Sequence, residues 1–353
     1  MSKIQTVFSE ICVAAAIADT SDIRVIKNIT DKPEIQALYA EALKNRINTD
    51  PASVLALTKV GAAIREFLRC KGIIPKEVAW TGNINTGSVV TVAKDIEVSN
   101  YRISVKENAN VFINASPLTV FEDMPLGKFG QKRRGSDWFL KSARDALNEY
   151  YLSCVDLLPV GSLIKIKYSG CIEDYYRNSN LSERKKFAAE VADLQKNPGQ
   201  SYNNIRENYA ILCQAVSKKS AELFNDRFCE FKNNNLSKNA LNPMFHYFFR
   251  INGVEYILAG TEKKNPFAVL VLSGSDWIKE FRLLDIKALA KPAGQPEVVL
   301  RFLFKKLSDR TEFSIDLIVQ IRWSHGKFCG NPEAKIYKSW AYNDLPWCMD
   351  ILN

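Results

Sequence analysis

The chain lacks the sequence patterns that mark several large classes of protein. No apolar run reaches the roughly 18 residues of a membrane-spanning helix. The eight cysteines include no C-x-x-C pair, so neither a zinc site nor a disulfide framework is expected in a chain of this size. Internal repeats and low-complexity tracts are also missing. These absences favour a globular protein with reduced cysteines, and we expect it in the cytoplasm and not in a membrane.

The N-terminal segment lacks the features of a secretory signal peptide. No basic stretch precedes the apolar patch within residues 1–22, and Glu10 lies inside that patch. We therefore expect this segment to form a folded helix or strand.

The composition combines ordinary apolar content with an excess of positive charge. Hydrophobic residues make up 46% and charged residues 25% of the chain, which is typical of a soluble globular protein. Its 353 residues accommodate two or three domains or one elaborated domain. The formal net charge of +9 and the isoelectric point near 9.0 favour a polyanionic partner such as nucleic acid.

Breaks and periodicity divide the sequence into four consecutive segments. Asp50-Pro51 ends one helical stretch, and the asparagines at 233–235 separate helical periodicity from short β-type runs. The expected segments are an N-terminal helical segment at 1–50, a core at 51–130, a helical region at 131–240 and a β-rich region at 241–353. Within the helical region, helices are expected at 136–158, 181–197 and 202–231. We accordingly predict a mixed α/β (α+β) fold.

The second segment begins with a helix and continues with a pair of strands. The spacing of apolar residues predicts an amphipathic helix over 53–71, which carries Glu66. Two strands are expected at 89–98 and 101–113, with a tight turn at 99–100.

Polar side chains on this helix and strand pair are of the types that phosphodiester hydrolysis requires. Asp95 lies on the first strand. Ser104 and Lys106 lie on the second strand, and their offset of two residues points both side chains to the same face. A divalent metal that activates water requires hard oxygen ligands, and a phosphodiester under attack requires a nearby cation. Glu66, Asp95 and Lys106 therefore predict metal-dependent hydrolysis.

This arrangement resembles the PD-(D/E)xK nuclease superfamily. Gly61 and Glu66 match the helix of that family. Asp95 matches the acid of its first strand, and Lys106 matches the lysine of its acid-x-Lys element. The resemblance implies a restriction-endonuclease-like core, Mg²⁺ or Mn²⁺ as cofactor, and a DNA endonuclease of the restriction or antiviral-defence kind. It also implies that Asp95 and Glu66 are metal ligands and that Lys106 orients the attacking water.

The sequence departs from the family pattern at Ser104, where Glu or Asp is usual. The departure removes one metal ligand. Glu66 or Glu97 would then supply the missing carboxylate, and Ser104 would be a secondary polar contact of the catalytic site. Taken singly, Glu66, Asp95 and Lys106 also have ordinary explanations as surface charges or ion-pair partners.

A second acid-x-Lys element lies near the C-terminus and is an alternative catalytic centre. Glu333 and Lys335 have the required spacing, and Asp316 precedes them. No helix bearing a glutamate precedes this set, and Pro332 indicates a loop or the first residue of a strand.

Basic and aromatic residues in two places are candidates for nucleic-acid binding. One group follows the candidate core and would hold the phosphate backbone, and the other follows a C-terminal strand and would contact bases. The first group is Lys132, Arg133 and Arg134, and the second is Arg322, Trp323, His325 and Lys327.

Together these features predict a Mg²⁺-dependent DNA endonuclease of a restriction or phage-defence system. The β-rich C-terminal region would supply DNA recognition or a contact in a homodimer. The alternative is a non-catalytic nucleic-acid-binding subunit of a larger defence complex. Such a protein would have kept the fold and lost activity because Ser104 replaces the usual acid.

Overall fold

The structure is a computed structural model, and helices and strands are mixed along the chain as the α+β prediction required. The described residues are 3–82, 94–107, 113–128, 137–196, 202–234, 248–249, 251, 253–262, 264–292 and 294–352. The helices are α1 (Lys3–Ala18), α2 (Pro33–Thr49), α3 (Pro51–Cys70), α4 (Trp138–Asp156), α5 (Leu163–Lys167), α6 (Ile172–Asn178), α7 (Leu181–Lys196), α8 (Tyr202–Asn234) and α10 (Gly274–Glu280). Short helical turns are η1 (Ile23–Val25), η2 (Thr119–Asp123), η3 (Met124–Leu126) and η4 (Tyr342–Asp344).

The strands form two separate sheets. They are β1 (Val78–Trp80), β2 (Ile96–Val98), β3 (Tyr101–Glu107), β4 (Ile113–Ala115), β5 (Tyr256–Glu262), β6 (Asn265–Val271), β7 (Phe281–Ala290), β8 (Glu297–Lys306), β9 (Glu312–Trp323), β10 (Pro332–Lys338) and β11 (Cys348–Asp350). Their order is β1-β2-β3-β5-β6-β11 in one sheet and β4-β10-β9-β8-β7 in the other. None of the described helices is long and apolar enough to cross a membrane.

The chain folds into two compact units, and each is built from discontinuous segments. Unit 1 contains Met1–Asn110, Phe245–Arg282 and Trp340–Asn353, and unit 2 contains Val111–Met244 and Leu283–Ser339. This division differs from the four consecutive segments expected from the sequence. The reason is the pairing of β3 with β5, which brings part of the β-rich C-terminal region into the sheet of the core segment.

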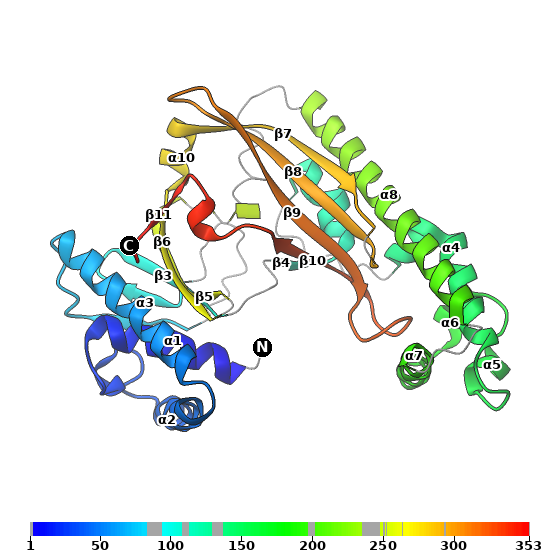
Figure 1. Ribbon diagram of the computed structural model, residues 1–353, viewed down its shortest axis with the longest axis horizontal. Helices are drawn as coiled ribbons and strands as arrows, with labels where there is room; N and C mark the ends of the chain where they lie inside the picture. Colours follow the sequence, from blue (N-terminus) through cyan, green and yellow to red (C-terminus); the bar gives the residue numbers. More distant parts are fainter. Residues whose placement is uncertain are drawn as a thin grey trace. The chain divides into compact units, whose positions relative to one another are not determined.

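Helices α1 and α3 cover one face of the unit 1 sheet (Figure 1). Neighbouring strands of this sheet are antiparallel except β3 and β5, which are parallel with Ile103 opposite Ile257. Every residue from Val7 to Ala15 is buried, so α1 is a central helix of the core. Burial of apolar side chains on this face is the main stabilising contribution to unit 1.

Gly61 permits close packing of α3 against α1. A Cβ atom at this position would lie 2.5 Å from Ala16 Cβ and 2.6 Å from the Val13 carbonyl oxygen. The glycine that matched the family pattern therefore has a definite structural role, because any larger side chain would push the two helices apart.

The predicted hairpin of the core segment is confirmed at its turn. β2 and β3 pair antiparallel with Ile96 opposite Ile103, and Ser99 occupies the turn with a left-handed φ of 51°. Val105 and Ile103 face the core, as the alternation predicted. The first half of the strand expected at 89–98 lies outside the described residues.

Unit 2 packs long helices beside its own sheet. The helices expected at 136–158, 181–197 and 202–231 are confirmed as α4, α7 and α8. β9 is paired antiparallel with both β8 and β10, and α8 packs against α4 and β8. Buried aromatic rings surround Phe328, which has a left-handed φ of 62°.

Candidate functional site

Asp95 and Lys106 meet at the point where β2 begins and β3 ends. The Asp95 N–H donates to the Ile103 carbonyl oxygen over 3.0 Å, which extends the β2–β3 pairing by one residue. Lys106 Nζ lies 3.8 Å from Asp95 Oδ2. The Asp95 side chain is 1% exposed and that of Lys106 is 26% exposed. The carboxylate is thus fixed inside the fold while the ammonium reaches the solvent.

Ser104 orients the Asp95 carboxylate. Its Oγ donates to Asp95 Oδ2 over 3.1 Å, and the Val105 N–H donates to the same oxygen over 2.7 Å. Both donors come from β3, which also carries Lys106. They therefore hold Asp95, the residue before β2, against β3. Ser104 is therefore a polar partner of the acid in this arrangement.

Glu10 on α1 is the second acid of this cluster. It is 2% exposed, and the Trp80 indole N–H donates to its Oε2 over 2.8 Å. Burial, together with the nearby charge of Asp95, raises the pKa of Glu10 to about 7. The hydrogen bond from Trp80 and the charge of Lys106 act in the opposite direction. Glu10, Asp95 and Lys106 are accordingly coupled through their charges.

The side chains of this cluster offer oxygen atoms as possible ligands. Two carboxylates and a hydroxyl are present, and oxygen donors are those that Mg²⁺ and Mn²⁺ prefer. Within the described part of the chain no group of three or more His, Cys, Asp or Glu side chains could hold a metal ion.

Glu66 does not join Asp95 and Lys106 in the structure. It is 59% exposed on α3, where its carboxylate pairs with Arg69 at 3.0 Å and with Arg65 at 3.5 Å. Glu10 of α1, and not Glu66, is the helical acid whose charge interacts with Asp95 and Lys106. A sequence signal for Glu10 existed, since it is the one acid within an otherwise apolar helical stretch.

Glu97 has a local ion-pair partner. Its carboxylate lies 2.8 Å from Lys94 Nζ, and its side chain is 37% exposed. Its role as a metal ligand stays a prediction.

The alternative acid-x-Lys set is spread along the unit 2 sheet. Asp316 forms a two-bond ion pair with Arg301, with distances of 2.8 and 2.9 Å. Glu333 pairs with Lys335 at 3.5 Å and lies opposite Arg322 of β9. Arg322 is six residues along β9 from Asp316, which separates Asp316 from Glu333 by about 20 Å. The three residues therefore do not form one site.

Two of the residues predicted to contact bases have partners inside unit 2. Trp323 is 8% exposed, its ring stacks on Phe139 with centroids 4.1 Å apart, and its N–H donates to Tyr176. Lys327 Nζ lies 3.6 Å from the centroid of the Tyr209 ring, and burial lowers its pKa to about 8. The prediction that Trp323 stacks on an unpaired base is wrong for this structure, because its ring is covered by protein.

The other nucleic-acid contacts expected from the sequence stay predictions. Arg322 is partly exposed and His325 is exposed. Lys132, Arg133 and Arg134 lie outside the described residues.

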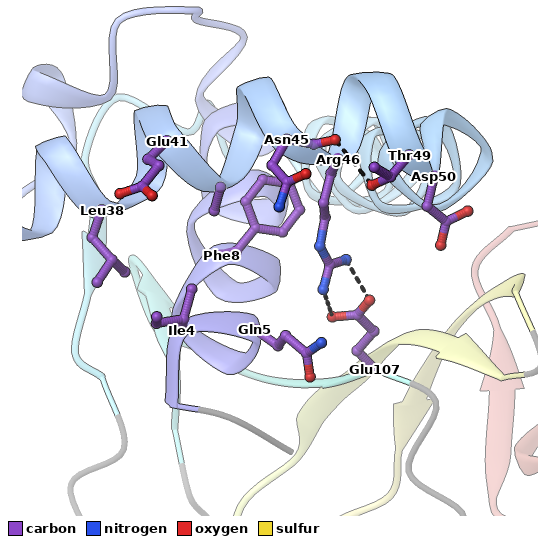
Figure 2. Close-up of a pocket in the computed structure, with 11 residues that line it drawn as sticks. Ile4, Gln5, Phe8, Leu38, Glu41, Asn45, Arg46, Thr49, Asp50 and Glu107 are labelled. Carbon is purple, nitrogen blue, oxygen red and sulfur yellow. Dashed lines mark hydrogen bonds and ion pairs between the residues drawn. The ribbon is translucent and has the colours of Figure 1, made fainter.

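A pocket of about 530 Å³ lies between α1 and α2 beside the end of β3 (Figure 2). Phe8 and Gln5 of α1 line it, and so do Asn45 and Arg46 of α2. Glu107, which follows Lys106, forms part of its wall. The pocket thus adjoins the strand that carries the candidate catalytic lysine.

Comparison of the chain with family models, with curated proteins and with solved structures found no match.

Proposed function

We propose that the protein is a metal-dependent nuclease and that unit 1 is a restriction-endonuclease-like core. The observation that carries this proposal is the convergence of Glu10, Asp95 and Lys106 from three separate elements. Bringing two carboxylates together inside a protein is unfavourable unless a cation compensates them or one of them stays protonated. Two carboxylates beside an ammonium group suit metal-dependent phosphodiester hydrolysis, because the acids can hold the ion and the ammonium can offset charge on the phosphate.

Glu10 and Asp95 would hold Mg²⁺ or Mn²⁺, and the bound ion would supply a Lewis acid and lower the pKa of a water molecule. Ser104 and the Val105 N–H keep the Asp95 carboxylate in a single orientation. Trp80 does the same for Glu10 through its indole N–H. Lys106, whose ammonium is partly exposed, offsets negative charge on the phosphate and orients the attacking water.

The substrate class follows from charge and from the site. The formal net charge of +9 favours a polyanion, and the proposed chemistry acts on phosphodiesters. A nucleic acid is therefore the proposed substrate. The choice of DNA, and of restriction or phage defence as the setting, rests on the resemblance to the PD-(D/E)xK nuclease superfamily.

Cleavage assays with active-site variants test the proposal. Purified protein is incubated with plasmid DNA in the presence of Mg²⁺, Mn²⁺ or a chelator. We expect metal-dependent cleavage by the wild type and a loss of roughly 100-fold or more in Lys106→Met, Asp95→Asn and Glu10→Gln. Asparagine is chosen at position 95 because alanine would leave the buried Val105 N–H without an acceptor.

Glu66→Gln is the matched control, since it removes an exposed glutamate from a neighbouring helix. It should cleave at the wild-type rate. Wild-type cleavage by Lys106→Met and Asp95→Asn would contradict the site assignment. Tight DNA binding without cleavage under any metal condition would favour a non-catalytic nucleic-acid-binding subunit instead.

A further inference from the structure

Glu107 collects hydrogen bonds from all three N-terminal helices. Ser9 of α1 donates to its Oε2, and Ser53 of α3 donates to its Oε1 over 3.3 Å. Arg46 of α2 forms two parallel bonds, with Nη1–Oε1 at 2.5 Å and Nη2–Oε2 at 3.1 Å. A single carboxylate at the end of β3 therefore ties together α1, α2 and α3.

The ion pair at the centre of this network is largely removed from solvent. The Arg46 and Glu107 side chains are 15% and 8% exposed, and Ser9 and Ser53 are buried. The Arg46 guanidinium also lies 4.5 Å from the centroid of the Phe8 ring on α1. Two fixed bonds and a stacked aromatic ring leave Arg46 few alternative positions.

The network is adjacent in sequence to two residues of the candidate site. Ser9 precedes Glu10 on α1, and Glu107 follows Lys106 on β3. The Ser9–Glu107 hydrogen bond therefore joins the two backbone segments that carry the second acid and the lysine. Because peptide units are rigid, fixing one residue restricts where its neighbour can lie.

Stability alone gives a weak reason for such a pair. Replacing a buried ion pair with apolar residues of similar volume is often neutral or stabilising. The location of the pair gives a stronger reason, since its network includes the residues next to both Glu10 and Lys106. A misplacement of about 1 Å in an active site can cost about 100-fold in rate.

We propose that Arg46 and Glu107 are positioning residues that hold Glu10 of α1 at a set distance from Lys106 of β3. The pair acts through its neighbours and does not touch the substrate. This inference rests on the proposed nuclease function for its kinetic readout, and its geometric content can be measured without activity.

An apolar double variant separates positioning from stability. Arg46→Met/Glu107→Leu fills the same volume without charge. We expect the midpoint of its unfolding transition to be close to that of the wild type. Its kcat for DNA cleavage should stay about 10- to 100-fold lower, while KM is unchanged. Wild-type kcat in this folded double variant would overturn the proposal.

Chemical rescue tests the geometry of the pair. Arg46→Ala removes the guanidinium from the wall of a pocket that opens to solvent (Figure 2). Added ethylguanidinium should restore kcat in a saturable way because it can form both bonds to Glu107. Ethylammonium has the same charge and only a point-like head, and should not. Equal rescue by the two cations would overturn the requirement for a two-bond pair.

Hydrogen exchange gives a readout that does not depend on catalysis. In Glu107→Gln we expect faster amide exchange at residues 8–12 and 103–107, which carry Glu10 and Lys106. Arg24→Ala is the matched control, since Arg24 makes two bonds to Asp22 at 2.7 Å on the exposed surface of the same unit. If the wild type cleaves no nucleic acid, the nuclease proposal fails. Amide hydrogen exchange then still tests whether Glu107 restrains the segments that carry Glu10 and Lys106. Unchanged exchange in Glu107→Gln would overturn the positioning proposal.

Discussion

Glu10 illustrates how the surroundings of one side chain determine its chemistry. Glu10 lies in an apolar helix. Its charged form is disfavoured both by burial and by the negative charge of Asp95. A buried carboxyl with a strongly raised pKa is often functional, because burying it lowers stability and a functional role can explain why it is kept.

The raised pKa of Glu10 predicts a specific pH dependence of stability. Below pH 4.5 the carboxyl is protonated in the folded and the unfolded chain. Between pH 4.5 and about 7 the unfolded chain releases this proton and the folded chain keeps it, so stability falls as pH rises through this window. Glu10→Gln removes this loss and should be more stable than the wild type by about 3 kcal/mol above pH 7.

Urea unfolding of both proteins at several pH values measures this difference. Glutamine can still accept the hydrogen bond from Trp80, so the two proteins should agree below pH 4.5. Parallel stability curves over the whole range would show that burial does not shift this group. Added Mg²⁺ should stabilise the wild type at high pH and leave Glu10→Gln unchanged, if Glu10 is a metal ligand.

At the scale of elements, the pairing of β3 with β5 depends on a glycine opposite Lys106. Gly260 has φ +144°, a conformation that other residues rarely adopt. A Cβ atom at this position would lie 1.7 Å from the Lys106 carbonyl oxygen. Because Gly260 has no side chain, β3 can pair closely with β5 at Lys106, the proposed catalytic lysine.

Gly260→Ala should consequently damage both stability and the site. We expect a loss of about 2–4 kcal/mol in the free energy of unfolding and strongly reduced cleavage, because β3 must move away from β5 at Lys106. Gly253→Ala is the control, since Gly253 is exposed and has no atom within 4 Å of an added Cβ. Chemical denaturation and cleavage rates measure both effects. Wild-type behaviour of Gly260→Ala would contradict the tight pairing.

At the scale of the whole molecule, the chain leaves unit 1 after its first part and returns twice. The strands β5, β6 and β11 all come from beyond residue 244. The unit 1 core includes Ile257, Ala259 and Leu270 from these strands. A nuclease core consisting only of residues 51–130, as the sequence indicated, would therefore lack half of its sheet.

Truncation tests this organisation. A fragment of residues 1–244 should retain helical circular dichroism but lack cooperative thermal unfolding. In this fragment β3 has lost β5, one of its two partner strands, and α1 and α3 have lost part of the surface they cover. The full-length chain is the reference. Cooperative unfolding of the fragment with dispersed amide resonances would show that the C-terminal strands are dispensable.

The basic residues at 132–134 predict a salt-dependent affinity for DNA. Neutralising Lys132, Arg133 and Arg134 together should weaken binding to all sequences and lower the log–log salt slope by roughly one for each phosphate that is no longer neutralised. Lys141→Gln is a suitable control, because the Lys141 ammonium already pairs with Glu122. Binding titrations at several salt concentrations measure the slope. An equal slope in the triple variant and the wild type would show that these residues do not contact DNA.

Local patterns in the sequence determined most of the elements and part of the site. Apolar periodicity predicted α3, α4, α7 and α8, because the side chains that a helix buries recur along the chain itself. The alternation of apolar and polar residues along β3 placed Ile103 and Val105 on the core face and Ser104 and Lys106 on the opposite face, because side chains of a strand point alternately to its two faces. The pairing of Asp95 with Lys106 also followed, since a short hairpin fixes its own register.

Only the tertiary structure decided which acid lies near Asp95 and Lys106 and which strands complete the sheet. Glu66 and Glu10 both lie on helices near the N-terminus, and only packing turns the first to solvent and the second toward Asp95. The parallel pairing of β3 with β5 joins residues that lie about 150 positions apart, and no local pattern specifies such a partner. Burial of Trp323 likewise depends on rings from other elements. Such contacts are selected by the packing of the whole core, in which each element's apolar face can be covered in several ways and one arrangement has the lowest free energy.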